Sequence, residues 1–236
     1  MVAALALLAL PGCTTTQERS AKMAENSETA AEAKRFNVGK TNPDVTAKDV
    51  TWIEGEGVGA VVVRVVNSSG SAQASVPIGL DLYTADKTSL YTNRIDGLEP
   101  ALNMLPLAPP GESWWVHNQL PADKPARERV RIGTSKVAPP KDIPRIDASE
   151  VTLGDDGGIP TGRGKITNRS EVEQQRITVF AVALKGDRIV AAGRSVVERL
   201  QAASAKKPEK FAIYFNGDPR GADIRVFVPP STLGDA

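Results

Sequence analysis

The chain has 236 residues, 24% of them charged and 41% hydrophobic, with a formal charge of +1. These are ordinary values for a globular protein of one or two domains, and the near-neutral charge argues against nucleic acid as a partner. The sequence contains one cysteine. An internal disulfide is therefore excluded, and the fold must be stabilised by its hydrophobic core.

The first residues form an apolar run, Val2–Leu10, which ends just before Cys13. A helix that spans a bilayer needs about 20 residues, so the run has instead the length of a signal-peptide core. Leu10-Pro11-Gly12-Cys13 resembles a bacterial lipobox. The resemblance implies a signal peptide at residues 1–12 and a lipid on Cys13. The alternative is a cytosolic protein with an apolar N-terminus and an unmodified thiol.

Residues 13–43 are rich in Ala, Glu, Lys, Ser and Thr and contain few large apolar side chains. Such a segment cannot bury enough apolar surface to offset the entropy lost on ordering. We therefore expect a flexible tether between the lipid on Cys13 and the folded part of the chain.

An internal repeat follows the tether. Asn67-Ser68-Ser69 and Asn168-Arg169-Ser170 lie 101 positions apart, and Val50-Thr51 and Val151-Thr152 have the same spacing. Repeated matches in one register indicate a duplicated domain of about 100 residues. Both Asn triplets are formal glycosylation sequons, but their matching positions favour a shared turn in which the Asn side chain bonds its own backbone. Near the ends of the copies, the best alignment places Trp114 opposite Phe211.

Each copy has strands and turns but no convincing helical pattern, although Val196–Ala205 could form one or two helical turns. Pro139, Pro140 and Pro144 predict an extended spacer between the copies. We therefore predict an all-β protein with two tandem β-sandwich domains, at residues 44–138 and 145–232. The expected strands are 59–66, 75–83, 114–117 and 129–132 in the first copy and 162–167, 176–184, 210–215 and 223–228 in the second.

Two families of bacterial envelope proteins resemble this arrangement. Leu80-Asp81-Leu82-Tyr83-Thr84 resembles the central motif of FxLYD-type domains, with Leu80 and Thr84 departing from it. Gly97-Leu98-Glu99-Pro100 and Arg129-Val130-Arg131-Ile132 are similar to segments of YcfL-type outer-membrane lipoproteins. Both resemblances imply an immunoglobulin-like fold, and neither carries catalytic residues.

The sequence offers little for catalysis. His117 is the only histidine and Cys13 is assigned to the lipid, so zinc or copper sites built from His and Cys are excluded. We expect His117 to be a strand-edge residue rather than a catalytic one. Gly158–Lys165 does not match the spacing of a phosphate-binding loop, and Ile166 stands where that loop needs Ser or Thr. Asp155-Asp156-Gly157-Gly158 fits a tight turn better than a calcium loop.

Two features remain as candidate binding surfaces. Trp115 follows Trp114, and adjacent strand residues point to opposite faces, so Trp115 is either exposed or covered by the loop at residues 98–110. Phe180, Val182 and Leu184 form an apolar strip on the face opposite Ile177 and Val179. An exposed strip would bind a partner, whereas a loop or the first domain would make it part of a core.

These observations predict a non-catalytic lipoprotein of the cell envelope, without a cofactor, that acts as a binding or structural accessory. The expected partners are the membrane, through the lipid, and another envelope protein or a cell-wall component. Its location would be the periplasmic or extracellular face, on the outer membrane where one exists. The alternatives are an envelope glycan hydrolase that uses carboxylates, and a carrier of a small apolar ligand between the sheets.

Overall fold

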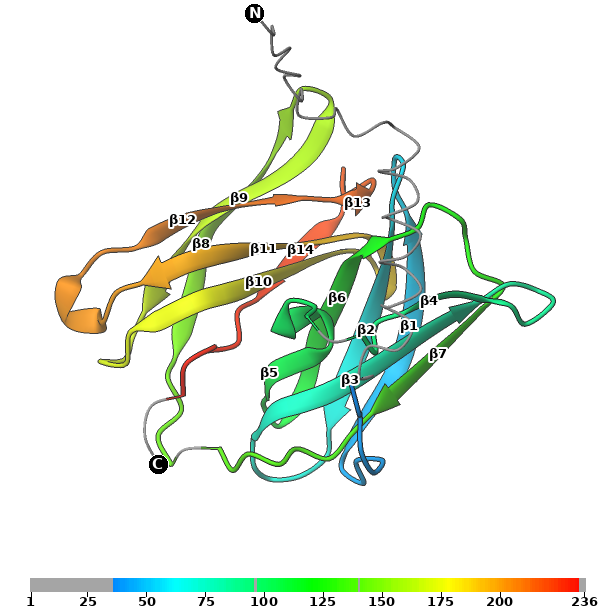
Figure 1. Ribbon diagram of the computed structural model, residues 1–236. Coiled ribbons are helices and arrows are strands. Elements are labelled where there is room, and N and C mark those ends of the chain that lie inside the picture. The colour runs from blue at the N-terminus through cyan, green and yellow to red at the C-terminus, as the bar shows by residue number, and fades with distance from the viewer. Residues whose placement is uncertain (1–35, 96, 140, 234–236) are drawn as a thin grey trace, which may run out of the picture. The chain divides into compact units, whose positions relative to one another are not determined.

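The computed structural model describes residues 36–95, 97–139 and 141–233 (Figure 1). Cys13, the predicted signal peptide and most of the predicted tether lie outside the described residues. The described chain starts before the domain boundary expected at residue 44. Val38 and Asn42 are both buried, and the Asn42 amide donates to the Gly133 carbonyl 3.1 Å away.

Antiparallel strands make up most of the described chain, which confirms the predicted all-β class. The first half contains β1 (Val45–Glu54), β2 (Gly59–Asn67), β3 (Gln73–Tyr83), β4 (Ser89–Thr92), β5 (Met104–Ala108), β6 (Gly111–Leu120) and β7 (Arg127–Ile132). The second half contains β8 (Ile146–Asp156), β9 (Ile159–Asn168), β10 (Gln174–Lys185), β11 (Arg188–Leu200), β12 (Glu209–Tyr214), β13 (Asn216–Gly217) and β14 (Asp223–Phe227). Short 3-10 turns, η1 (Pro100–Leu102) and η2 (Ala203–Ala205), interrupt them.

The two halves share one strand plan. In the first half β1, β2 and β6 form one sheet, and β3 pairs with β4, β5 and β7 in the other. In the second half β8, β9 and β12 form the matching sheet, while β10 pairs with β11 and β14. Each half is thus built from two antiparallel sheets, as expected for a β-sandwich. The immunoglobulin-like classification stays a prediction.

The predicted turn at the two Asn triplets is the same device in both halves. Asn67 and Asn168 are buried, and each Oδ1 accepts hydrogen bonds from the backbone and hydroxyl of the Ser two residues later. Each Nδ2 donates to two backbone carbonyls, one of them in a distant segment. Each Asn side chain therefore satisfies four polar groups. This structural role explains why the Asn triplet recurs 101 residues later, and glycosylation is not needed to explain it.

The strand pairing differs from two of the sequence-based expectations, the match of Trp114 to Phe211 and the helical turns at Val196–Ala205. Val63 and Gly164 are equivalent positions, 101 residues apart. Val63 pairs with Trp115 and Gly164 pairs with Phe211, so Trp115, and not Trp114, is the equivalent of Phe211. The predicted match was one residue out, and a slip of one residue exchanges the two faces of a strand. Val196–Leu200 belongs to β11 and does not form the helical turns that the sequence allowed there. The short 3-10 turn η2 follows at Ala203–Ala205.

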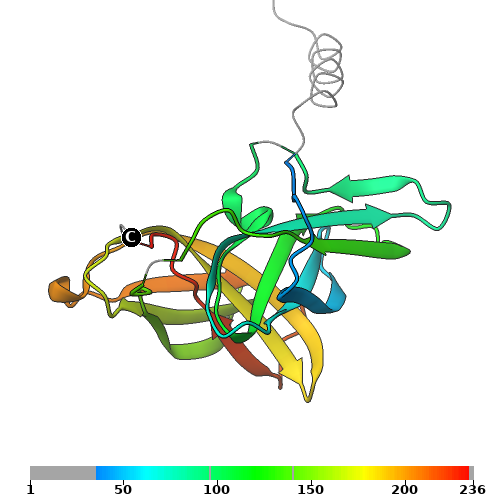
Figure 2. The ribbon, with the colours of Figure 1, turned by 90° about the horizontal axis from the view of Figure 1, so that it is seen from below.

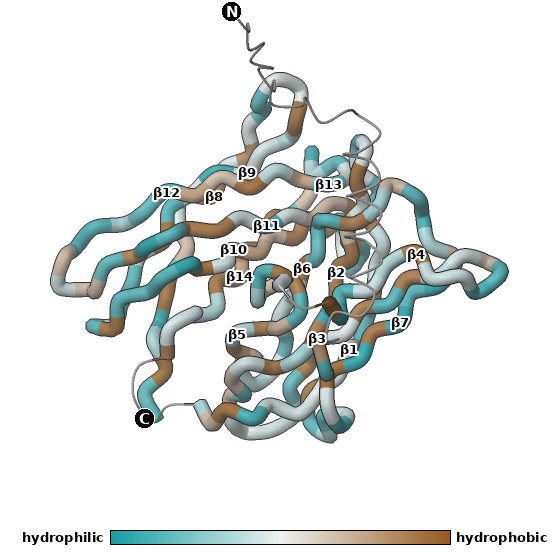
Figure 3. Tube along the Cα trace, in the orientation of Figure 1, coloured by the Kyte–Doolittle hydropathy of each residue, from teal (hydrophilic) through white to brown (hydrophobic). Residues whose placement is uncertain are grey.

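The halves are packed into a single compact unit, with the β1-β2-β6 sheet of the first half against the β10-β11-β14 sheet of the second (Figures 1 and 2). The central parts of strands β2, β6 and β10 are consequently buried on both faces, and β2 and most of β10 are hydrophobic there (Figure 3). The core shared by the two halves is continuous from Ile78 and Val63 to Phe180. The Pro-rich segment is therefore a connection between packed sheets.

Candidate binding cleft

The four side chains predicted as candidate binding surfaces lie in the core. Trp115, Phe180 and Val182 are fully buried, and Leu184 is 3% exposed. The Trp115 indole N–H donates to the Ala101 carbonyl 2.8 Å away, so the ring lies beneath η1 in the loop that the sequence indicated. Burial with a satisfied N–H makes Trp115 a structural residue.

Phe180, Val182 and Leu184 face the first half, while Ile177 and Val179 face the core of their own half. The Phe180 ring stacks on Phe227, with ring centroids 6.3 Å apart. The apolar strip is thus covered by the first half, the second of the two outcomes that the pattern allowed.

One buried ion pair crosses between the halves. The Arg194 guanidinium of β11 donates to both carboxylate oxygens of Glu99, at 3.1 and 2.5 Å, and its Nε donates to the Asn118 side chain at 3.1 Å. The Arg194 side chain is only 4% exposed. A bidentate pair of this kind fixes the relative position of the halves, because opening it would leave the Arg194 guanidinium buried without its counter-charge.

His117 has no exposed surface and lies in the core of the first half, whereas the sequence indicated a strand edge. Its Nε2 is 2.8 Å from the Tyr91 hydroxyl, and its ring makes edge contacts with Trp115 and Tyr91. Burial, with a smaller contribution from the positive charge of Arg194, lowers the pKa of His117 to about 3. Burial also raises the pKa of Tyr91 to about 12. Both groups are therefore neutral at physiological pH.

The two loop-like motifs are a turn and a strand. Gly157 and Gly158 join β8 to β9 with positive φ, and the Asp155 carboxylate accepts the Gly158 N–H at 2.7 Å. After Gly158, the residues of the second motif, Ile159–Lys165, belong to β9. Within residues 36–233 as described, no three His, Cys, Asp or Glu side chains are grouped as metal ligands. In that same part of the chain, no helix is long and apolar enough to cross a bilayer.

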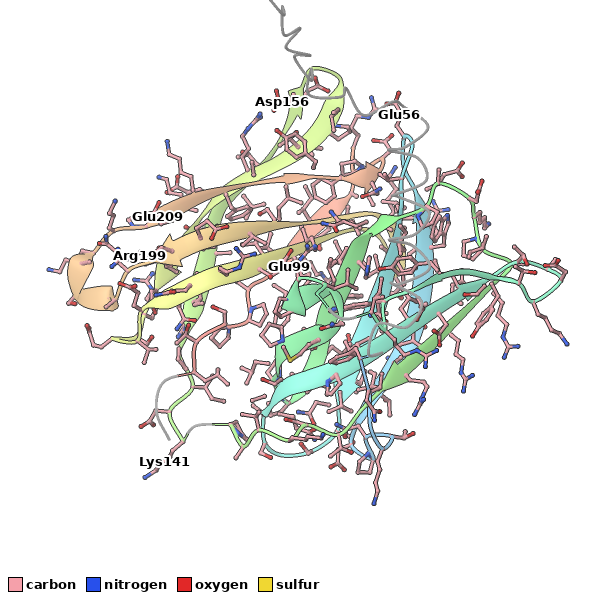
Figure 4. All side chains as sticks on the ribbon, in the orientation of Figure 1. Glu56, Glu99, Lys141, Asp156, Arg199 and Glu209 are labelled. Carbon is pink, nitrogen blue, oxygen red and sulfur yellow. The ribbon has the colours of Figure 1, made fainter. Side chains whose placement is uncertain are left out.

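A cleft of about 1030 Å³ opens at one end of the contact between the halves. One wall is the tip of the β1–β2 hairpin and the other is the tip of the β8–β9 hairpin, which carry Glu56 and Asp156 in Figure 4. Asn118, Asn216 and Gly217 contribute to its lining from β6 and β13. The Asn216 amide donates to the Val58 carbonyl at 3.3 Å, which links the second half to the hairpin of the first.

The cleft gathers apolar side chains that the fold leaves in contact with solvent. Seven large hydrophobic side chains of the described residues are exposed, and four of them line this cleft. They are Val58, Leu153, Ile159 and Tyr214, which are 37–50% exposed. Apolar side chains scattered over a surface need no explanation, but a concentration in one concave site is typical of a binding site.

Carboxylates outnumber cations among the residues that line the cleft. Glu54, Glu56, Asp155 and Asp218 face a single guanidinium, that of Arg220. Arg220 is itself bound to Asp218, with Nε 2.7 Å from Oδ1, and these hydrogen bonds lower the pKa of the Asp218 carboxyl. At the rim the Tyr214 hydroxyl donates to Asp156 at 2.9 Å, and that bond raises the pKa of the phenol.

No local sequence pattern indicates this cleft. Its walls come from two hairpins about a hundred residues apart, and each wall alone is an ordinary exposed turn. The available hint was the repeat itself, because Glu54-Gly55-Glu56-Gly57 and Asp155-Asp156-Gly157-Gly158 occupy equivalent hairpins. No protein family has a profile that matches this chain, and no curated protein matches it.

Proposed function

We propose that the chain is a non-catalytic lipoprotein of the cell envelope, anchored through Cys13, whose folded part binds another envelope component at the cleft. The observation that carries the proposal is the concentration of Val58, Leu153, Ile159 and Tyr214 in one concave surface. Outside this cleft, the candidate binding residues of the sequence are buried in packing. The membrane anchor and the envelope location rest on the N-terminal sequence.

Binding accounts for the cleft better than glycan hydrolysis does. A hydrolase needs one carboxyl group with a raised pKa to act as a general acid. The Arg220 guanidinium instead lowers the pKa of the Asp218 carboxyl, which is the opposite of what a general acid requires. A carrier of an apolar ligand would need space between the sheets, where Ile78, Leu80 and Trp115 are packed with no exposed surface.

The binding proposal is tested by placing a photoreactive phenylalanine analogue at Ile159 in the full chain, in the cells that produce it. Ile143 is the matched control, because it is also an exposed isoleucine, 40% against 46%, but lies outside the cleft. We expect a discrete adduct from position 159 and none from position 143. Equal adducts at both positions, or none at 159, would refute binding at the cleft.

The anchor is tested separately with an alkyne-bearing fatty acid. We expect the wild-type chain to incorporate the label and to fractionate with membranes, and Cys13→Ser to do neither. Incorporation that persists in the Cys13→Ser variant, or an unlabelled wild-type chain, would contradict lipidation at this cysteine.

A further inference from the structure

We infer that the cleft binds a cationic segment of another polypeptide that carries apolar side chains. The inference rests on the proposed function and names the chemistry of its partner. Three properties of the cleft support it: size, the kind of surface on its walls, and charge.

Size favours a segment of several residues. Small-molecule sites have volumes of about 300–1,000 Å³ and enclose most of the ligand. The cleft is at the upper limit of that range, at about 1030 Å³, and lies open between two hairpin tips. An open site of this volume encloses a small ligand poorly, whereas an extended segment can lie along it between the two hairpins.

The walls favour apolar side chains in the partner. Leu153 and Ile159 come from the β8–β9 hairpin and Val58 from the β1–β2 hairpin, so apolar surface meets the cleft from both sides. Burying such surface is favourable by about 25 cal/mol per Å². The site is also held in place, because the bond from Asn216 to the Val58 carbonyl joins the halves beside it. A preformed site loses less conformational entropy on binding.

The negative charge of the cleft favours a cationic partner. Glu54 and Glu56 stand on the hairpin tip, both exposed, and Asp155 faces them from the other hairpin. The one guanidinium among the lining residues, Arg220, is already paired with Asp218. The excess of carboxylates over guanidinium groups attracts Lys or Arg side chains and repels acidic segments, and this preference weakens with salt.

The chain's own N-terminal segment fits the cleft less well. Residues 14–35 carry four acidic and four basic side chains and one large apolar residue, Met23. The acidic ones are Glu18, Glu25, Glu28 and Glu32, and the basic ones are Arg19, Lys22, Lys34 and Arg35. This balanced, polar composition matches neither the charge nor the apolar walls of the cleft. A separate polypeptide is therefore the inferred occupant.

The experiment measures fluorescence anisotropy of labelled ten-residue peptides with the full chain carrying Cys13→Ser. One peptide alternates Lys and Val, a second replaces Lys by Glu, a third replaces Val by Ser, and a fourth copies residues 14–23. We expect the Lys-Val peptide to bind at least tenfold more tightly than the other three. Spermine at equal concentration should not displace it.

Matched variants locate the binding. Glu54→Gln with Glu56→Gln should weaken binding of the Lys-Val peptide about fivefold and reduce the salt dependence of that binding. The effect is moderate because each lost interaction is an exposed ion pair. Ile159→Ser should also weaken it. Asp123→Asn with Glu171→Gln, two exposed carboxylates outside the cleft, should leave it unchanged.

The outcomes separate this inference from the proposed function. Equal binding of the Lys-Val and Glu-Val peptides, or full displacement by spermine, overturns the cationic polypeptide while the adduct at Ile159 still supports a partner. Tighter binding of the 14–23 peptide assigns the cleft to the chain itself and overturns the inference. Binding that the cleft variants leave unchanged also overturns it. Loss of the Ile159 adduct removes the proposed function together with the inference.

Discussion

The two halves follow one strand plan but place it in different surroundings. In the first half the β1-β2-β6 sheet lies between its own partner sheet and the second half, and β2 is buried on both faces. In the second half the matching β8-β9-β12 sheet is on the outside, and six of the ten residues of β9 are partly or fully exposed. Val62 of β2 lies at the contact between the halves. The equivalent position in β9 is Arg163, whose side chain is about half exposed. Duplication has kept the turns and the strand order, and packing has decided which faces became apolar.

The largest expected effect tests whether the shared core joins the halves into one folding unit. Phe180→Ala should lower the free energy of unfolding by about 4 kcal/mol, because it removes a fully buried ring and leaves a cavity. The three tryptophans, Trp52, Trp114 and Trp115, all lie in the first half. Urea unfolding followed by tryptophan fluorescence should therefore report the loss, although Phe180 belongs to the second half.

Ile159→Ala is the control for this experiment, since Ile159 is 46% exposed on the outer hairpin. We expect it to change stability by less than about 0.5 kcal/mol. A tryptophan transition that Phe180→Ala leaves in place would mean that the halves unfold independently, as two separate domains would.

Removal of the ion pair between the halves should have the next largest effect. Glu99→Ala leaves the Arg194 guanidinium buried with Asn118 as its remaining partner, so we expect a loss of about 3 kcal/mol. Glu112→Ala breaks the exposed pair with Lys48 and should cost less than about 1 kcal/mol. Equal costs for the two variants, measured by urea unfolding, would show that Glu99 contributes nothing as a link between halves.

The duplicated Asn turns should respond alike. Asn67→Ala removes the bond to the Ala108 carbonyl and Asn168→Ala the bond to the Gln201 carbonyl, in each case from a buried side chain, and each should cost about 2 kcal/mol. Ser69→Ala and Ser170→Ala remove a hydroxyl bond at the half-exposed or exposed edge of the same turn and should cost less than half as much. A large difference between the two Asn variants would show that the turns are not energetically equivalent.

Local patterns predicted what depends on neighbouring residues. The Asn turns were predictable because three of the four hydrogen bonds of each Asn side chain join residues two to four apart. Val76, Ile78, Leu80 and Leu82 lie two residues apart in the expected strand 75–83, and all four are buried. The match of Trp114 to Phe211 failed because the segment before β6 differs in length between the halves, and sequence similarity does not fix register across such a change.

What depends on contacts between the halves was not predictable. The strand that carries Phe180 was recognisable as apolar on both faces. Hydrophobic attraction is non-directional, however, so the pattern could not show which surface covers the Phe180 face. The pairing of Arg194 with Glu99 joins residues 95 positions apart, from a loop in the first half that has no counterpart in the continuous β11. The cleft has the same origin, since its two hairpins meet only after the halves have packed.

The smallest expected effect concerns one pair of equivalent core positions with different chemistry. His117 pairs with Val61 as Ile213 pairs with Gly162, so the first half carries a titratable ring where the second carries an aliphatic side chain. The pKa of His117 falls from an ordinary 6.5 to about 3 on folding, because burial disfavours the charged ring. Between these values the unfolded chain binds a proton that the folded chain does not, so stability falls as the pH is lowered.

The expected loss between pH 7 and pH 5.5 is about 1 kcal/mol, measured by urea unfolding at the two pH values. His117 is the only histidine, and the carboxyl groups with lowered pKa titrate below this window, so the change reports the ring. His117→Ile copies the second half at this position and should abolish most of the slope, whatever its own cost in leaving the Tyr91 hydroxyl without its partner. A slope that survives the substitution would assign the pH dependence to another group and place His117 in a more hydrated setting than the core around Trp115.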